Sequence, residues 1–262
     1  SRDASPAAAA ADGVLWHRLP VDPAALSMAI PHWIAVCPLW AVPEHLSLMK
    51  AAGARRLVAL SSTSRFTKRG SPAAVDREIA DRLAAAEDAV LDGARDRGIV
   101  ATILRPTLIY DGVHDRNVTV IADVIRRFGF YPVAGTAVGL RQPVHADDVA
   151  AACQNALGCE GLGDAYEISG GETLPYHEMV RRIFAWMGRP TRLARIPLPL
   201  VRAALPLASC LPGTAALAAM AARMNEDLVF DHEAAARDFG FQPRPFTLPL
   251  RRDSHHAASG IR

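Results

Sequence analysis

The chain has 262 residues, of which 50% are hydrophobic, so it can bury one large core or two small ones. A net charge of +2 gives no strong field that would favour nucleic acid as a partner. The four cysteines are scattered without a CxxC pair, a pattern that supports neither a metal site nor a disulfide framework and favours a cytoplasmic location. We find no signal-peptide pattern and no uncharged apolar run of about 18 residues, so we expect no transmembrane segment.

Short apolar runs alternate with helical patterns in the first part of the chain. Residues 79, 83, 86 and 90 form one apolar stripe, which predicts a helix over 75–97 that ends at Gly98. Strands and helices that alternate at this spacing are typical of a parallel α/β sheet with right-handed crossovers. The predicted strands are 13–18, 33–38, 57–60 and 99–104, and the other predicted helices are 22–29 and 44–52.

The regular alternation of strands and helices ends after Asp111, where longer polar connections separate the elements. We predict a helix capped by Thr173 that runs to Met187, and two helices within the apolar, proline-punctuated segment 195–223. The sequence therefore divides into residues 1–112, a Rossmann-like nucleotide-binding part, residues 113–250, a smaller substrate-binding part that interleaves with it, and a disordered tail at 251–262. The remaining predictions are helices at 117–128, 147–157 and 231–239, an extended piece at 139–145 and a strand at 166–169.

Four consecutive hydroxyl residues follow the strand predicted at 57–60. They are Ser61, Ser62, Thr63 and Ser64. Ligands of open parallel sheets bind beyond the carboxyl ends of the strands, which is where these side chains are expected to lie. The alternative interpretation is that the hydroxyls only satisfy backbone groups where the strand becomes a loop.

Four sequence motifs, the first of which contains the hydroxyl run, indicate which family the chain resembles. VALSSTS (58–64), TILRPTLIYDG (102–112), RQPVHADDVAA (141–151) and YEISGGETL (166–174) occur in order, and ARDFGFQPRP (236–245) follows them. Together they resemble the NAD(P)-dependent epimerase/dehydratase family, the extended and atypical short-chain dehydrogenases/reductases. The resemblance implies a doubly wound Rossmann-like sheet that binds NAD or NADP, and a smaller C-terminal α/β domain for a small-molecule substrate such as a nucleotide-sugar.

The resemblance also implies roles for individual residues. Thr63, with Ser62 beside it, matches the hydroxyl that assists proton transfer. Arg141 matches an arginine that meets substrate phosphate, for which its planar fork is suited, although a surface ion pair explains it as well. His145 is expected to be structural, bonding the loop ahead of the helix at 147–157. The residues that would line the cofactor are Cys37, Pro38, Leu39, Ser61, Pro106, Thr107 and Leu108.

The chain departs from the family at its start. No GxGxxG or GxxGxxG turn occurs, although the family binds the cofactor pyrophosphate on such a turn. Three accounts stay open: the chain is a fragment of a longer protein, which we favour, another chain supplies the missing strands, or residues 1–11 cover the gap. We predict weak or no NAD(P) binding by these 262 residues alone, and an unpaired edge on the strand at 33–36.

A second departure affects catalysis. The family's base is a Tyr with a Lys four residues later, but Ile79 and Leu83 stand at those positions and cannot exchange a proton. Lys68 could approach a cofactor ribose, with a solvated surface position as the alternative that we favour. Tyr110 lies past a strand end, and we predict that it is not the base.

Two functions from different classes remain. The first is an NAD(P)-dependent epimerase/dehydratase-like oxidoreductase that acts on a nucleotide-sugar or similar substrate. The second is a non-catalytic dinucleotide-binding sensor or assembly protein, a kind to which an accessory subunit of respiratory complex I belongs. Residues 196–223 then form a docking surface for a partner, a second copy or a membrane face, with C-terminal core as the alternative.

Overall fold

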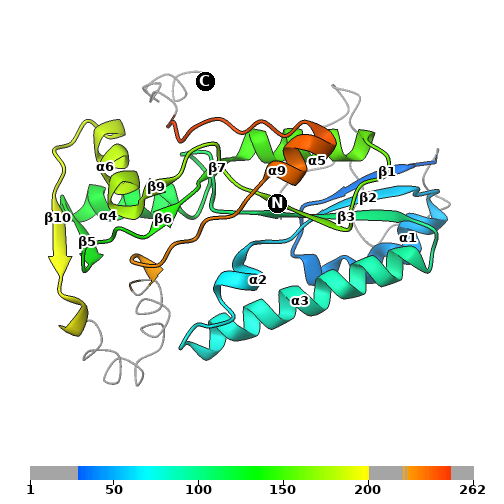
Figure 1. Cartoon of the computed structure of the whole chain (residues 1–262), viewed down its shortest axis with the longest axis horizontal. Coiled ribbons are helices and arrows are strands. Elements are labelled where there is room, and N and C mark those ends of the chain that lie inside the picture. The colour runs from blue at the N-terminus through cyan, green and yellow to red at the C-terminus, as the bar shows by residue number, and fades with distance from the viewer. Residues whose placement is uncertain (1–28, 201–220, 222, 249–262) are drawn as a thin grey trace, which may run out of the picture.

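A four-stranded parallel sheet organises the structure, a computed structural model that describes residues 29–200, 221 and 223–248 (Figure 1). The strand order is β1-β2-β3-β8, and all three neighbouring pairs are parallel. Within the described residues β1 pairs with β2 alone, so it lies at the sheet edge as predicted. The strands are β1 (His32–Ala35), β2 (Arg56–Leu60), β3 (Val100–Pro106) and β8 (Ala165–Ile168).

Helices cover both faces of this sheet, because successive strand residues point in opposite directions. Leu57 and Ile103 pack against α1 and α3 on one face, and Val58 and Leu104 pack against α5 and α9 on the other. Figure 1 shows α3 below the strands and α5 with α9 above them. The predicted doubly wound α/β fold is therefore confirmed. The helices are α1 (Leu46–Ala51), α3 (Ala74–Arg95), α5 (Ala146–Gly158) and α9 (Glu233–Phe239).

Helix α3 arises from the apolar stripe that the sequence shows. Leu83, Ala86 and Val90 are buried against the sheet, and the helix ends before Gly98, whose φ of +65° suits glycine. Ile79 is only half-buried. Short elements precede the helix along the chain: η4 (Leu39–Ala41), η5 (Pro43–His45) and α2 (Ser64–Thr67).

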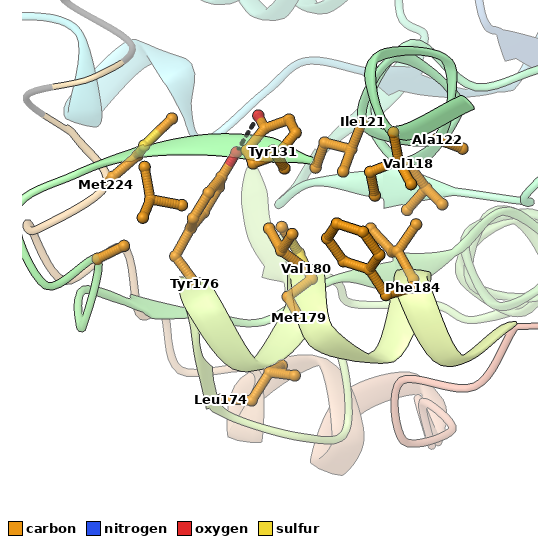
Figure 2. Packing of buried hydrophobic residues seen from close by; sticks show 14 of the residues in the cluster. Val118, Ile121, Ala122, Tyr131, Leu174, Tyr176, Met179, Val180, Phe184 and Met224 are labelled. Atoms are coloured by element: carbon orange, nitrogen blue, oxygen red, sulfur yellow. Dashed lines mark hydrogen bonds between the residues drawn. The ribbon is translucent and has the colours of Figure 1, made fainter. Parts of the chain in front are cut away.

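A second core lies beside the sheet and is built from residues 110–246 (Figures 1 and 2). Its centre holds Ile183 and Phe184 of α6 against Ile121 and Ile125 of α4, all buried. Strands β5 and β10 pair in parallel along this core. The elements are α4 (Val118–Phe128), β5 (Tyr131–Ala134), α6 (Tyr176–Trp186) and β10 (Leu193–Ile196).

Two short strand pairs connect this core to the sheet. Strand β4 (Ile109–Tyr110) pairs with β7 (Val144–His145), and β6 (Leu140–Arg141) pairs antiparallel with β9 (Leu174–Pro175). The predicted cap at Thr173 is wrong. Leu174 is held in extended conformation by its pairing with Arg141, so α6 begins three residues later with Pro175 as its N-cap.

Other predictions differ in extent or lie outside the described residues. The prediction of helices over 195–223 is wrong at the start of this segment, because Arg195 and Ile196 belong to strand β10. The strand predicted at 13–18, all of the helix predicted at 22–29 except Ala29, the tail at 251–262 and most of 196–223 lie outside the described residues. The domain boundary at residue 112 stays a prediction. In the described part of the chain, no helix is long and apolar enough to cross a membrane, and no cluster of His, Cys, Asp or Glu forms a metal site.

Candidate functional site

A cavity of about 370 Å³ opens beyond the carboxyl ends of β2 and β3. This is the edge at which open parallel sheets bind ligands. Three cationic residues and no Asp, Glu, His, Tyr or Cys occur among its described lining residues. The lining residues are Ser61, Ser62, Thr63, Ser64, Thr67, Lys68, Pro106, Thr107, Leu108, Ile109, Asn117, Arg141, Gln142, Arg223, Leu228 and Phe230.

The hydroxyl run lines the cavity and also bonds to neighbouring groups. Thr63 Oγ1 donates to the Pro106 carbonyl at 3.2 Å, and the Ser61 hydroxyl donates to Glu87 at 2.5 Å. The Ser62 hydroxyl accepts from the Ser64 amide at 3.1 Å. The hydroxyls therefore hold the loop in shape, as the alternative interpretation expects, and they also line the cavity. Their role toward a ligand stays a prediction.

Arg141 reaches the cavity wall with most of its guanidinium engaged by the main chain. Its Nη1 donates to the carbonyls of Leu140 at 2.7 Å and Glu226 at 2.8 Å, and Nη2 donates to the Arg223 carbonyl. The residue is 5% exposed and its guanidinium lies 5.4 Å from the Tyr176 ring centre. Burial lowers the pKa of Arg141 from its ordinary value. The hydrogen bonds of Arg141 hold residues 223–226 against strand β6.

Lys68 and Arg223, which line the cavity, share a buried carboxylate behind it. Asp76 accepts from Lys68 Nζ at 2.9 Å, from Arg223 Nη1, and from the Ser71 hydroxyl at 3.0 Å. Burial alone raises the pKa of the Asp76 carboxyl, but the bonds from Lys68 and Arg223 outweigh it and leave the pKa below its ordinary value. The expected solvated position of Lys68 is wrong, since the ion pair draws it to the cavity with its side chain 22% exposed.

The positions of the family's catalytic pair carry no acid or base. Ile79 is half-buried, and Leu83 is buried in the apolar stripe of α3. Tyr110 is fully buried and its hydroxyl accepts from the Thr247 amide at 3.1 Å. Burial raises the pKa of Tyr110, which further opposes a role as base. His145 has the predicted structural role, because its Nδ1 accepts from the Asp147 amide at the start of α5.

The cavity gathers most of the predicted site residues. Ser61, Ser62, Thr63, Arg141 and residues 106–108 are among the residues that line it. Cys37, Pro38 and Leu39 lie outside this lining, and Leu39 is buried against α3 in the sheet core. Their cofactor role stays a prediction, as do the roles of the residues inside the cavity.

Several lining residues have no clear signal in the sequence. Phe230 and Leu228 come from a loop that follows the apolar segment, where no periodicity marks them. Gln142 follows Arg141 within a quoted motif, and its Oε1 accepts from the Phe230 amide at 2.7 Å. The bond explains how a remote segment reaches the strand ends.

Comparisons with known proteins support the same fold. No protein-family model matches the chain. The solved UDP-glucuronic acid 4-epimerase of Bacillus cereus, in complex with NAD, superposes with a TM-score of 0.58 at 12% identity, covering 79% of this chain and 61% of that one. The dTDP-glucose 4,6-dehydratase of Streptomyces venezuelae gives 0.53 at 19% identity, covering 77% and 59%.

The described residues thus have the fold of the NAD-dependent nucleotide-sugar epimerases and dehydratases, and the predicted resemblance is confirmed at that level. In sequence, 122 residues are 33% identical to subunit 9 of the NADH dehydrogenase [ubiquinone] 1 alpha subcomplex, a mitochondrial protein of Arabidopsis thaliana. The match covers 46% of this chain and 29% of that subunit. The chain therefore spans less than a third of the curated relative.

Proposed function

We propose that the protein binds NAD or NADP and a phosphate-bearing ligand of the nucleotide-sugar class without converting either. The cavity supports this proposal by its position at the strand ends and by its lining of hydroxyls and cations. Solved proteins of the same fold are a UDP-glucuronic acid epimerase with NAD and a dTDP-glucose dehydratase with NAD. NAD and NADP both remain candidates.

The observation that carries the non-catalytic part is the chemistry of the lining. Hydride transfer to or from a sugar alcohol needs a group that takes or returns the hydroxyl proton. The described lining offers Lys68, Arg141 and Arg223, each engaged as a cation, and hydroxyls whose pKa is far above neutral when no Tyr–Lys pair assists them. Ile79 and Leu83 provide no substitute on α3. Binding is thus the chemistry that these residues support.

A binding role also fits the curated relative, which is named as a subunit of a larger complex. We propose that the protein acts as a nucleotide-responsive sensor or assembly component. Its cytoplasmic location stays a prediction.

The test uses the full natural polypeptide. Calorimetric titration with NADH and NADPH is expected to show binding, and incubation with NAD plus UDP-glucose or UDP-glucuronic acid is expected to give no new sugar by mass spectrometry. Product that disappears in Thr63→Val would establish the oxidoreductase instead. Absence of binding by both cofactors would remove the proposal.

A further inference from the structure

A second cavity adjoins the first at the Lys68–Asp76–Arg223 cluster. Its volume is about 200 Å³, and Thr67 and Arg223 line both cavities. Asp76 lines neither, yet it is bonded to both cations and is only 6% exposed. Arg223 therefore stands at the junction of the two spaces, with a carboxylate behind it.

We infer that Asp76 is a resident counter-ion of the two cations of a diphosphate site, and that a ligand diphosphate bound in the cavity replaces it as the partner of Lys68 and Arg223. The inference rests on the proposed function and adds a residue that sets its affinity. It names nucleoside diphosphates as the ligand class.

The arrangement of charges supports this assignment. One carboxylate neutralises one of two cations, so the pair keeps a surplus positive charge beside the cavity. Arg141 adds a third cation to the same lining, although Glu226 and Asp227 act on it electrostatically. A diphosphate carries more charge and more acceptor oxygens than one carboxylate, so it can compete for both cations.

The anchoring of the cluster explains why a counter-ion is useful there. Lys68 caps the short helix α2, Asp76 lies in the first turn of α3, and Arg223 precedes Met224, which is buried in the second core. Arg141 holds the Arg223 carbonyl, so the arginine is fixed at its backbone end. Asp76 then keeps both side chains ordered in the free protein, and its charge opposes the binding of weakly charged anions.

The variant Asp76→Asn tests the inference because it keeps the shape and removes the charge. Titration of the full natural polypeptide with inorganic pyrophosphate and with UDP is expected to show about tenfold tighter binding in this variant, the effect of one removed competing charge. Asp81→Asn, an exposed acid on the same helix, is the matched control and is expected to change nothing. A purely structural Asp76 predicts equal or weaker binding, and that result overturns the inference.

A second variant covers the case in which Asp76→Asn does not fold. Lys68→Met is expected to weaken UDP binding about tenfold, while Lys50→Met, at the only other lysine of the chain, leaves it unchanged. Equal affinities of the two lysine variants overturn the inference. If UDP and pyrophosphate bind to no variant, the inference also fails, whereas NADH binding still decides the proposed function separately. If UDP and NADH compete, the site binds the diphosphate of the cofactor. If both bind at the same time, the site binds the diphosphate of a second ligand.

Discussion

Arg105 and Glu87 form an ion pair beneath the cavity, with 2.6 Å between Nη2 and Oε2. Glu87 is fully buried in α3, and it also accepts bonds from Ser61 and Arg65. Arg105 lies near the end of β3 and bonds Glu167 at 3.1 Å as well. This pair joins the helix to the strand ends and holds the hydroxyl run in place.

Replacing the fully buried Glu87 by Gln is expected to lower the free energy of unfolding by about 3 kcal/mol, because it leaves the half-buried Arg105 with Glu167 as its remaining carboxylate partner. Urea unfolding followed by circular dichroism measures the change. Asp88→Asn, at the exposed neighbour on α3, is the control. Equal stability of the two variants would show that the buried pair contributes nothing.

Gly170 is expected to tolerate no side chain. A Cβ there would lie 1.9 Å from the Pro143 carbonyl oxygen, and backbone atoms cannot move aside cheaply. Gly170→Ala is therefore predicted to destabilise the protein by about 2 kcal/mol or more, as overpacking does. Gly158→Ala meets nothing within 4 Å and is the control. A thermal melt of Gly170→Ala that matches Gly158→Ala would contradict this close approach.

The buried hydroxyls of Tyr131 and Tyr176 share one hydrogen bond at 2.9 Å, in which either group can be the donor (Figure 2). Either Tyr→Phe change leaves the other hydroxyl unpaired and is expected to cost about 1–2 kcal/mol. The double variant removes both polar groups, so its loss is predicted to be smaller than the sum of the two single losses. A double-mutant cycle by urea unfolding measures this coupling, and strict additivity would argue against the bond.

Acid is expected to weaken the protein partly through Glu178. Hydrogen bonds from Arg181 and then Arg182 lower the pKa of this carboxyl to about 2 from an ordinary value of 4.5, although burial opposes the shift. Because the folded-state pKa is the lower one, the stabilisation is present above pH 4.5 and is lost as the pH falls towards 2.

Glu178→Gln tests this pH dependence. Wild type is expected to exceed the variant in unfolding free energy at pH 7, and the gap is expected to close between pH 4.5 and 2. Glu160→Gln, whose side chain is 93% exposed, is the control. A gap that stays constant over this range would refute the assignment.

The sheet was predictable because its signals are local. Leu57–Leu60 and the stripe on α3 identify a strand and a helix from their own residues, and glycines such as Gly98 mark where helices end. The helix cap predicted at Thr173 was wrong because Leu174 pairs with Arg141, which is distant in the sequence. Local capping chemistry cannot foresee such a pairing.

The site was predictable only along the strand ends. Thr63 and Pro106 lie within motifs that carry the family resemblance, and they meet in the cavity. Lys68 was expected at the solvated surface and Arg223 was not assigned to the site, because both pair there with Asp76, a residue that no sequence pattern marks. An ion cluster of this kind appears only when the elements are packed together.

Paired binding and turnover measurements on the full natural polypeptide test the central claim most directly. In one arm NADH is added and bound cofactor is measured by fluorescence. In the other arm NAD and a UDP-sugar are supplied in D₂O, and the sugar is analysed by mass spectrometry for conversion or carbon-bound deuterium. We predict bound cofactor with an unchanged, unlabelled sugar. A converted or deuterium-labelled sugar, lost on Thr63→Val, would contradict the account.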